Sequence, residues 1–319
     1  MKWLMLGLCL AMPGQGWAYT AYVTNERDDT LSVVDLDQMK TVKTIAVGQR
    51  PRGITITKDG SQILVCASDD DTIQIIDAAT LRIVGELPSG PDPETFALHV
   101  SGNPLYVSNE DDNLITVIDV PSRKVLAQIP TGVEPEGMAV SPDGQTIVNT
   151  SETTNMAHFL DYQTRKMVAA VLVDARPRVA MFKHDGSEVW VSSELGGTVS
   201  VIDPVKHVVT HKIAFEIQGL RAEAIQPVGI RFTQDDQMAF VALGPANRVA
   251  VIDTKTYKVK KLLLVGQRVW QMAFTPDQKY LLTTNGLSND ISVIDVADLD
   301  VVKSIQVGRL PWGVVVSPK

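Results

Sequence analysis

Cysteine is nearly absent from this 319-residue sequence. It occurs only as Cys9 and Cys66, and neither belongs to a CxxC or CxxCH motif. The sequence therefore excludes a zinc ribbon, thioredoxin-type chemistry and covalent c-type haem attachment. If Cys9 is removed with a leader, as argued below, Cys66 has no partner for an internal disulfide, and its apolar neighbours predict a core residue.

Positive charge is also scarce. The 29 Lys and Arg residues are outnumbered by 37 Asp and Glu residues, which gives a formal net charge of -8. A protein that binds nucleic acid needs a basic surface opposite the phosphates, so we expect no nucleic-acid partner. The composition, with 45% hydrophobic and 21% charged residues, is typical of a folded globular chain.

Long hydrophobic runs are missing, and the one apolar stretch of note is at the start. Lys2 precedes an apolar stretch over residues 3–12, and the small residues Gly16 and Ala18 follow it. About ten apolar residues are too few for a membrane span, which needs about twenty. The pattern is typical of a secretory signal peptide. We expect residues 1–18 to be removed after Ala18 and the remaining chain to be periplasmic, with no membrane span.

The sequence does contain a repeat. Two apolar residues followed by Asp recur at intervals of 42, 42, 42, 42, 50 and 42 residues. Short β-branched runs bounded by Pro, Gly, Asp and Asn fill each interval and predict four strands per unit. A four-stranded unit of about 42 residues is the size of a propeller blade. The repeated aspartates are Asp35, Asp77, Asp119, Asp161, Asp203, Asp253 and Asp295.

The two ends of the chain complete one unit. Residues 311–319 supply one strand of a unit, and residues 19–25 begin with the strand that should come next. We therefore predict an all-β, seven-bladed β-propeller over residues 19–319, with four-stranded blades and a last blade closed by N-terminal strands plus the C-terminal strand. Such closure removes free sheet edges. The repeated aspartates each end a strand before a turn, so we predict that they cap backbone N–H groups and are not catalytic.

Two sequence motifs resemble a known repeat family. Residues 22–25 (YVTN) and 106–109 (YVSN) are each followed by a strand that ends in Asp, which resembles the YVTN β-propeller repeat family. The layout of a signal peptide plus seven units is similar to the propeller proteins associated with pyrroloquinoline-quinone (PQQ)-dependent catabolism. This resemblance implies an exported accessory protein of periplasmic alcohol oxidation, without catalytic residues to carry over. The chain more distantly resembles amine dehydrogenase propeller subunits and d1-haem propellers.

The candidate site surrounds the proline that opens the first strand of most units. In a propeller, the loops that enter the innermost strands form rings around the central channel. A purely structural ring would tend to repeat one residue type, whereas these positions vary in charge and size. The candidate ligand-binding residues are Arg50, Arg52, Glu94, Glu134, Glu136, Arg176, Arg178, Arg268, Trp270 and Trp312, and Asp92 belongs to the same ring.

These residues are expected to surround one opening of the central channel, called the mouth below. Three interpretations of the mouth remain open. An acidic wall could face a wall of arginine and tryptophan, which would suit a small anionic aromatic ligand such as a quinone. The face could instead dock a periplasmic protein, either a dehydrogenase or a cytochrome. In the third interpretation, Arg and Glu of adjacent blades simply pair across the opening.

No paired acids, metal motif or nucleophile arrangement is recognisable in the sequence, so we predict a non-enzymatic, monomeric binding protein with no metal and no resident cofactor. A lactonase-like hydrolase, an amine-dehydrogenase-type large subunit and a haem or quinone carrier remain as alternatives. The loop glutamates Glu110, Glu152 and Glu194 come from successive units, and we expect the blade spacing to keep them too far apart for calcium. Eight extra residues within 213–228 are expected to overhang the same face as the charged rings, as a lid, a partner contact or neutral length variation.

Overall fold

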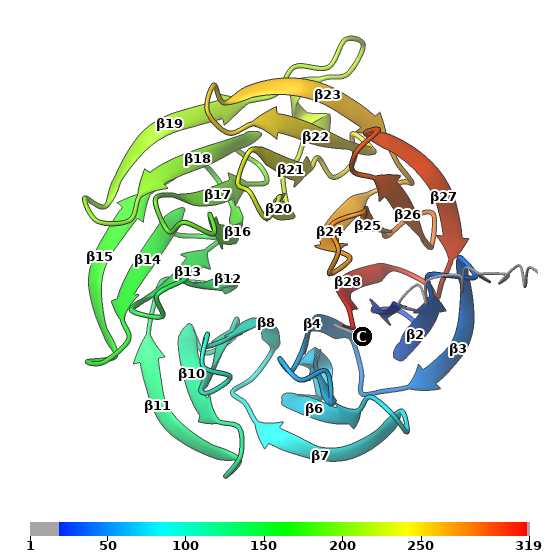
Figure 1. Cartoon of the computed structure of the whole chain (residues 1–319). Helices are drawn as coiled ribbons and strands as arrows, with labels where there is room; N and C mark the ends of the chain where they lie inside the picture. Colours follow the sequence, from blue (N-terminus) through cyan, green and yellow to red (C-terminus); the bar gives the residue numbers. More distant parts are fainter. Residues whose placement is uncertain (1–18, 318–319) are drawn as a thin grey trace, which may run out of the picture.

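The computed structural model describes residues 19–317 and shows a ring of antiparallel sheets around a central channel (Figure 1). Seven four-stranded sheets form the blades, so the predicted seven-bladed β-propeller is confirmed. The expected signal peptide over residues 1–18 lies outside the described residues. Within them, no helix is long and apolar enough to cross a membrane.

Each blade runs from an inner strand at the channel to an outer strand at the rim (Figure 1). The inner strands are β28 (Pro311–Val316), β4 (Pro51–Ile56), β8 (Pro93–Leu98), β12 (Pro135–Val140), β16 (Pro177–Phe182), β20 (Ile230–Phe232) and β24 (Val269–Phe274). The second strands are β1 (Thr20–Asn25), β5 (Gln62–Ala67), β9 (Leu105–Asn109), β13 (Thr146–Ser151), β17 (Val189–Ser193), β21 (Met238–Ala242) and β25 (Tyr280–Asn285). The third strands are β2 (Thr30–Asp35), β6 (Thr72–Asp77), β10 (Leu114–Asp119), β14 (Met156–Asp161), β18 (Thr198–Asp203), β22 (Arg248–Asp253) and β26 (Asp290–Asp295). The outer strands are β3 (Lys40–Ala46), β7 (Arg82–Pro88), β11 (Lys124–Pro130), β15 (Lys166–Leu172), β19 (Val208–Ala214), β23 (Lys258–Leu264) and β27 (Asp300–Gln306). Two short 3-10 turns, η1 (Ser68–Asp70) and η2 (Ala222–Ala224), lie in loops.

The repeated aspartates have the predicted local role. At the end of each third strand, the Asp carboxylate accepts a hydrogen bond from the backbone N–H three residues later, for example from Thr164 to Asp161 at 2.7 Å. The same contact occurs in all seven blades. Such a contact stabilises the turn that leads to the outer strand. Capping is therefore confirmed as the role of these aspartates.

The ring closes as predicted. Strand β28 pairs antiparallel with β1, with Val314 opposite Val23 and Val316 opposite Ala21. The Thr24 hydroxyl also donates to the carbonyl of Arg52 in the next blade, at 2.9 Å. Strands from the two ends of the chain thus share one sheet, and the N-terminal strands have no free inner edge.

Apolar side chains pack between neighbouring blades. Phe240 of β21 meets Phe274 of β24 edge to face, with ring centroids 5.6 Å apart. Trp190 is fully buried and packs against Phe232 in the same manner, at 5.0 Å. Cys66 is also buried, as predicted. Because each sheet buries both faces against its neighbours, the channel walls are held rigidly and the inner strands can present polar side chains at one end.

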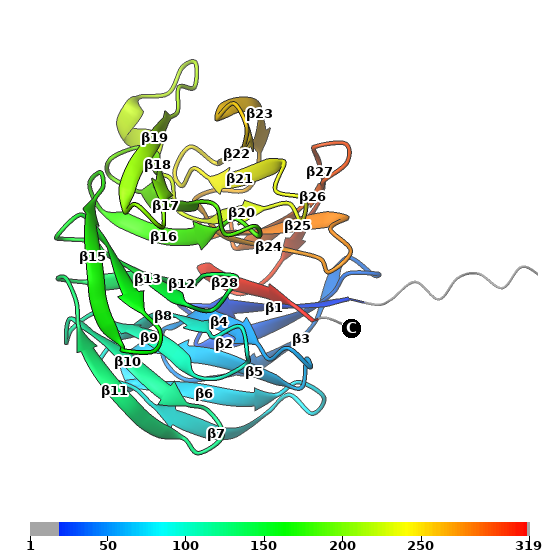
Figure 2. The same ribbon diagram turned by 60° about the vertical axis from the view of Figure 1, so that its left-hand side comes forward.

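The eight-residue insertion lies at the rim of the ring. Phe215 and Ile225 anchor it in the hydrophobic cluster around Trp190, while residues 218–223 are exposed. In Figure 1 the loop between β19 and β20 extends outward past β23, and Figure 2 shows it projecting beside β19. None of its residues lines the cavity at the channel mouth. The loop is therefore not a lid over the mouth in this structure, because its apolar anchors hold it against the outer part of the blade.

Candidate functional site

The mouth of the channel is a polar cavity of about 480 Å³ where loops enter the inner strands. It is lined by Glu26, Arg50, Arg52, Asp92, Glu110, Asp111, Arg176, Arg178, Glu194, Arg268, Trp270, Leu310 and Trp312. Seven of the ten predicted site residues are in this lining. Glu94 and Glu136 are buried beside these residues and pair with their arginines. Glu134 lines an adjoining hollow of about 310 Å³ together with Glu110, Glu152 and Arg176. The charged residues of the mouth and of this hollow, with Glu94 and Glu136, are called the charged layer below.

The same backbone conformation recurs in most blades just before the inner strand and positions these side chains. The residue before the proline has a positive φ, for instance 48° at Arg50 and 57° at Arg176. Its backbone N–H donates to an Asp or Asn side chain of the preceding blade, as from Arg50 to Asp29 at 2.9 Å and from Arg176 to Asn155 at 3.0 Å. The left-handed conformation is costly for residues with a Cβ, and such strain is common at functional sites.

One ion-pair network joins the blades of β28, β4 and β8. The Glu94 carboxylate is fully buried and accepts hydrogen bonds from both Arg50 and Arg52. Arg50 also contacts Asp92 at 2.6 Å, and Arg52 contacts Glu26 at 3.3 Å. Burial alone would raise the pKa of Glu94, but the two arginines lower it to about 2. These arginine charges are therefore neutralised within the protein.

A second network joins the blades of β12, β16 and β24. Arg178 is 4% exposed and pairs with Glu136 at 3.0 Å and with Glu152. Around it, Arg176 contacts Glu152 at 2.8 Å and Arg268 contacts Glu194 at 3.0 Å. The three glutamates are each at most 5% exposed. Charges buried to this degree require partners, which explains the dense pairing.

The two tryptophans already stack on arginines. The Arg268 guanidinium lies 4.4 Å from the ring centroid of Trp270, and Arg52 lies 5.8 Å from that of Trp312. The mouth is consequently not divided into an acidic wall and an arginine–tryptophan wall, and this interpretation is wrong. Equivalent positions of adjacent blades are neighbours around the ring, so opposite charges pair across the opening as in the third interpretation.

Carboxyl groups outnumber arginines in this layer. The five arginines Arg50, Arg52, Arg176, Arg178 and Arg268 face the nine acids Glu26, Asp92, Glu94, Glu110, Asp111, Glu134, Glu136, Glu152 and Glu194. Burial, followed by the charge of Glu94, raises the pKa of Asp92 to about 7 and that of Glu110 to about 8. Burial also raises the pKa of Glu136. Asp92 and Glu110 thus hold their protons up to near-neutral pH.

The loop glutamate Glu110 lies closer to other acids than expected. Its carboxylate falls within 4.8 Å of those of Asp92 and Glu94 on one side, and of Glu134 and Glu152 on the other. The expectation that blade spacing keeps the loop glutamates apart is wrong for Glu110 and Glu152, because long side chains of neighbouring units converge there, whereas Glu194 belongs to neither cluster. Clustered carboxylate oxygens of this kind attract cations. The recurrence of Glu after the second strand in three successive units was the sequence signal for this feature.

Comparisons with known proteins agree with the fold. A family model described as "Choice-of-anchor I domain" matches residues 119–290, more than half of the chain. No curated protein matches the sequence.

Among solved structures, the chain is similar to Kuenenia stuttgartiensis hydrazine synthase, at 20% identity and a TM-score of 0.73, over 82% of this chain and 87% of that one. It is similar to a functionally unknown protein from Desulfotomaculum acetoxidans, at 15% identity and a TM-score of 0.80, over 93% and 98% of the two chains. It also resembles dihydro-heme d1 dehydrogenase NirN, at 15% identity and a TM-score of 0.71, over 94% and 75%. Likeness at these identities shows a shared fold.

Proposed function

This chain belongs to the Choice-of-anchor I domain family, and we propose that it is an exported, non-enzymatic binding protein whose channel mouth docks a cationic group of a periplasmic protein partner. The surplus of carboxyl groups around the mouth carries this proposal. Glu110 and Glu134 form no ion pair with any residue in 19–317, although other carboxylates surround them. An inserted Lys or Arg side chain would compensate the negative charge of this carboxylate cluster.

The proposed class of partner rests on the sequence resemblance. The resemblance to YVTN propellers associated with PQQ-dependent catabolism supports a role beside a quinoprotein dehydrogenase or a cytochrome of periplasmic alcohol oxidation. The signal-peptide features of residues 1–18 support export. We propose that the protein acts there as a monomer, without a resident cofactor.

A planar anionic ligand, or a haem or quinone carried at the mouth, has less support. Such a molecule would have to displace Arg268 from the face of Trp270 and Arg52 from Trp312. It would also bring negative charge to a layer in which acids already exceed arginines. Docking of a cationic partner has neither cost.

One observation favours an enzyme as the second candidate. Burial raises the pKa of Glu110 to about 8 in an accessible cavity, which is the state expected of a general acid near neutral pH. A lactonase-like hydrolase could use such a group. Assay of a panel of lactones against wild type and Glu110→Gln tests it, since hydrolysis that is lost in the variant and declines as pH rises above about 8 would replace the docking proposal.

The docking proposal is tested on protein purified from its own periplasm. We expect native mass spectrometry at low ionic strength to show a complex with a dehydrogenase or cytochrome, identified by its mass and its quinone or haem. The complex should be lost in the double variant Glu110→Gln/Glu134→Gln and at high salt, because exposed charge pairs are screened. The matched control Glu216→Gln/Glu223→Gln replaces two carboxyl groups of the insertion loop in the same way and should keep the complex. A partner-free wild type, or equal complex in both double variants, contradicts the proposal.

A further inference from the structure

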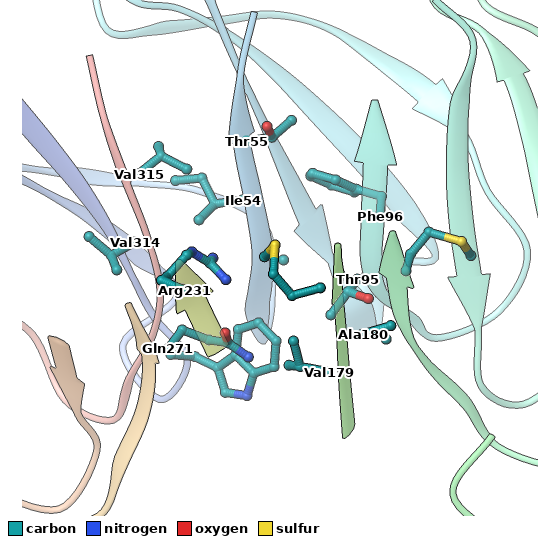
Figure 3. Close-up of a pocket in the computed structure, with 16 residues that line it drawn as sticks. Ile54, Thr55, Thr95, Phe96, Val179, Ala180, Arg231, Gln271, Val314 and Val315 are labelled. Carbon is teal, nitrogen blue, oxygen red and sulfur yellow. The ribbon is translucent and has the colours of Figure 1, made fainter. Parts of the chain in front are cut away.

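A second cavity lies inside the channel, below the charged layer (Figure 3). Its volume is about 250 Å³, and apolar side chains such as Ile54, Phe96, Val179 and Val314 share its wall with polar groups, among them Thr95 and Gln271. Trp312 borders both this cavity and the mouth and is 3% exposed. The indole therefore separates the two spaces.

Arg231, on β20, is the one charged side chain that lines this cavity among the described residues. The equivalent position, four residues after the proline position, is uncharged on the other inner strands: Thr55, Ala97, Ala139, Met181, Ala273 and Val315. Figure 3 shows Arg231 and Gln271 on one side of the cavity, with Thr95 and Phe96 on the other. A single blade thus breaks an otherwise uncharged ring.

The Arg231 guanidinium has no acidic partner in residues 19–317. Its one hydrogen bond runs from Nη1 to the carbonyl of Ile230, at 2.7 Å. Burial lowers its pKa to about 10, so it remains charged at neutral pH. A buried charge is unfavourable unless it is paired, and every arginine of the mouth layer has a carboxylate. The other guanidinium donors of Arg231 have no protein partner among the described residues, and the side chain borders the cavity.

We propose that this cavity binds a small organic monocarboxylate with an apolar body. The carboxylate pairs with Arg231, whose planar fork matches two carboxylate oxygens, and the Gln271 amide stands on the same side as a further donor. The apolar body lies against Ile54, Phe96 and Val314. The volume is below the roughly 300–1,000 Å³ of pockets for drug-sized ligands, so the ligand is of the size of hexanoate or benzoate.

The cavity selects against other anions. A phosphate, sulfate or dicarboxylate would place additional charge against apolar walls, where no described side chain compensates it. Arg231 also borders a hollow of about 300 Å³ with Phe232, Phe274 and Val316, at the far ends of the inner strands. The ligand therefore enters from the end opposite the mouth. This site is independent of the docking role proposed for the mouth.

Isothermal titration of the whole mature chain with hexanoate and with 1-hexanol tests the proposal. We expect hexanoate to bind, and the alcohol, which has the same apolar body, to bind at least about tenfold more weakly, since a charge-assisted hydrogen bond is lost. Arg231→Met, which introduces the residue found at the equivalent Met181, should lower hexanoate affinity by about tenfold or more and leave the alcohol unaffected. Arg221→Met, on the exposed insertion loop, is the matched control and should bind as wild type does.

Two results would overturn the proposal. One is the absence of hexanoate and benzoate binding by wild-type protein at millimolar concentration. The other is equal hexanoate affinity in wild type and Arg231→Met. The comparison of carboxylate with alcohol uses wild-type protein alone, so it decides the question even if the variant does not fold. Glu110→Gln should leave hexanoate affinity unchanged, which separates a failure here from a failure of the docking proposal.

Discussion

Arg178 at the mouth and Arg231 in the channel interior stand on β16 and β20, the inner strands of adjacent blades; Arg178 is buried and Arg231 is half-buried. Arg178 is surrounded by Glu136, Glu152 and Glu194, whereas Arg231 contacts only the carbonyl of Ile230 among polar groups of the described chain. The first charge is compensated by the fold, and the second is not. Arginines of one channel can thus link blades in one layer and lack an acidic partner in the next.

The largest effect is expected from breaking the compensated site. Arg178→Met would leave three buried glutamates without their central partner, and removal of one member of a buried ion pair typically costs about 3–5 kcal/mol. We expect a loss of that order in the free energy of unfolding, measured by urea denaturation. Arg221→Met, which removes an exposed arginine, serves as the control. A change in Arg178→Met as small as in the control would mean that the network contributes nothing to stability.

The uncompensated site should respond in the opposite direction. Arg231→Met removes a half-buried charge that has no acidic partner, so in ligand-free protein we expect the free energy of unfolding to rise by about 1 kcal/mol. Urea denaturation measures this change. Added hexanoate should reduce the difference in the free energy of unfolding between Arg231→Met and wild type, because it stabilises only the wild type. If Arg231→Met is destabilised as much as Arg178→Met, then Arg231 stabilises the fold as Arg178 does, and its charge is not uncompensated.

A smaller effect concerns the surplus acids of the mouth. In the folded protein the pKa of Asp92 is about 7 and that of Glu110 about 8, whereas in the unfolded chain both lie near about 4. The folded state therefore binds more protons between these values, so the stabilisation from these groups is complete below about pH 4 and is lost as pH rises to about 8.

Calorimetric melting across this pH range measures the effect. Because Asp92→Asn/Glu110→Gln cannot ionise at these positions, its melting temperature should fall less with pH than that of wild type. Asp69→Asn/Asp111→Asn, which removes two other acids on the loop face, is the comparison variant. Parallel pH profiles for wild type and Asp92→Asn/Glu110→Gln would contradict the raised pKa values.

Much of the fold was predictable because the physics that makes it is local and repeated. The Asp that ends each third strand caps a turn through contacts three residues away, and its 42-residue recurrence gave the number of blades. The closure by β28 and β1 followed from the same period. Most predicted site residues also reached the mouth, because equivalent repeat positions must fall on one ring.

Interactions between units were not predictable in this way. The sequence suggested two charged walls, but Arg52 and Glu94 stand 42 residues apart and pair because their blades are adjacent. Glu110 and Glu152 were expected to lie too far apart to meet, and instead they approach each other together with Glu134. Arg231 was missed, although an alignment of the inner strands would have exposed it as the one charge at its repeat position.

By itself, then, the amino-acid sequence determined the all-β architecture, the seven blades, the turn caps and the ring of residues at the channel mouth, since each depends on spacing along the chain. Only the tertiary structure decided which charges are compensated. Compensation depends on burial and on distances between side chains of different blades, and these arise when the ring closes and brings seven inner strands around one axis.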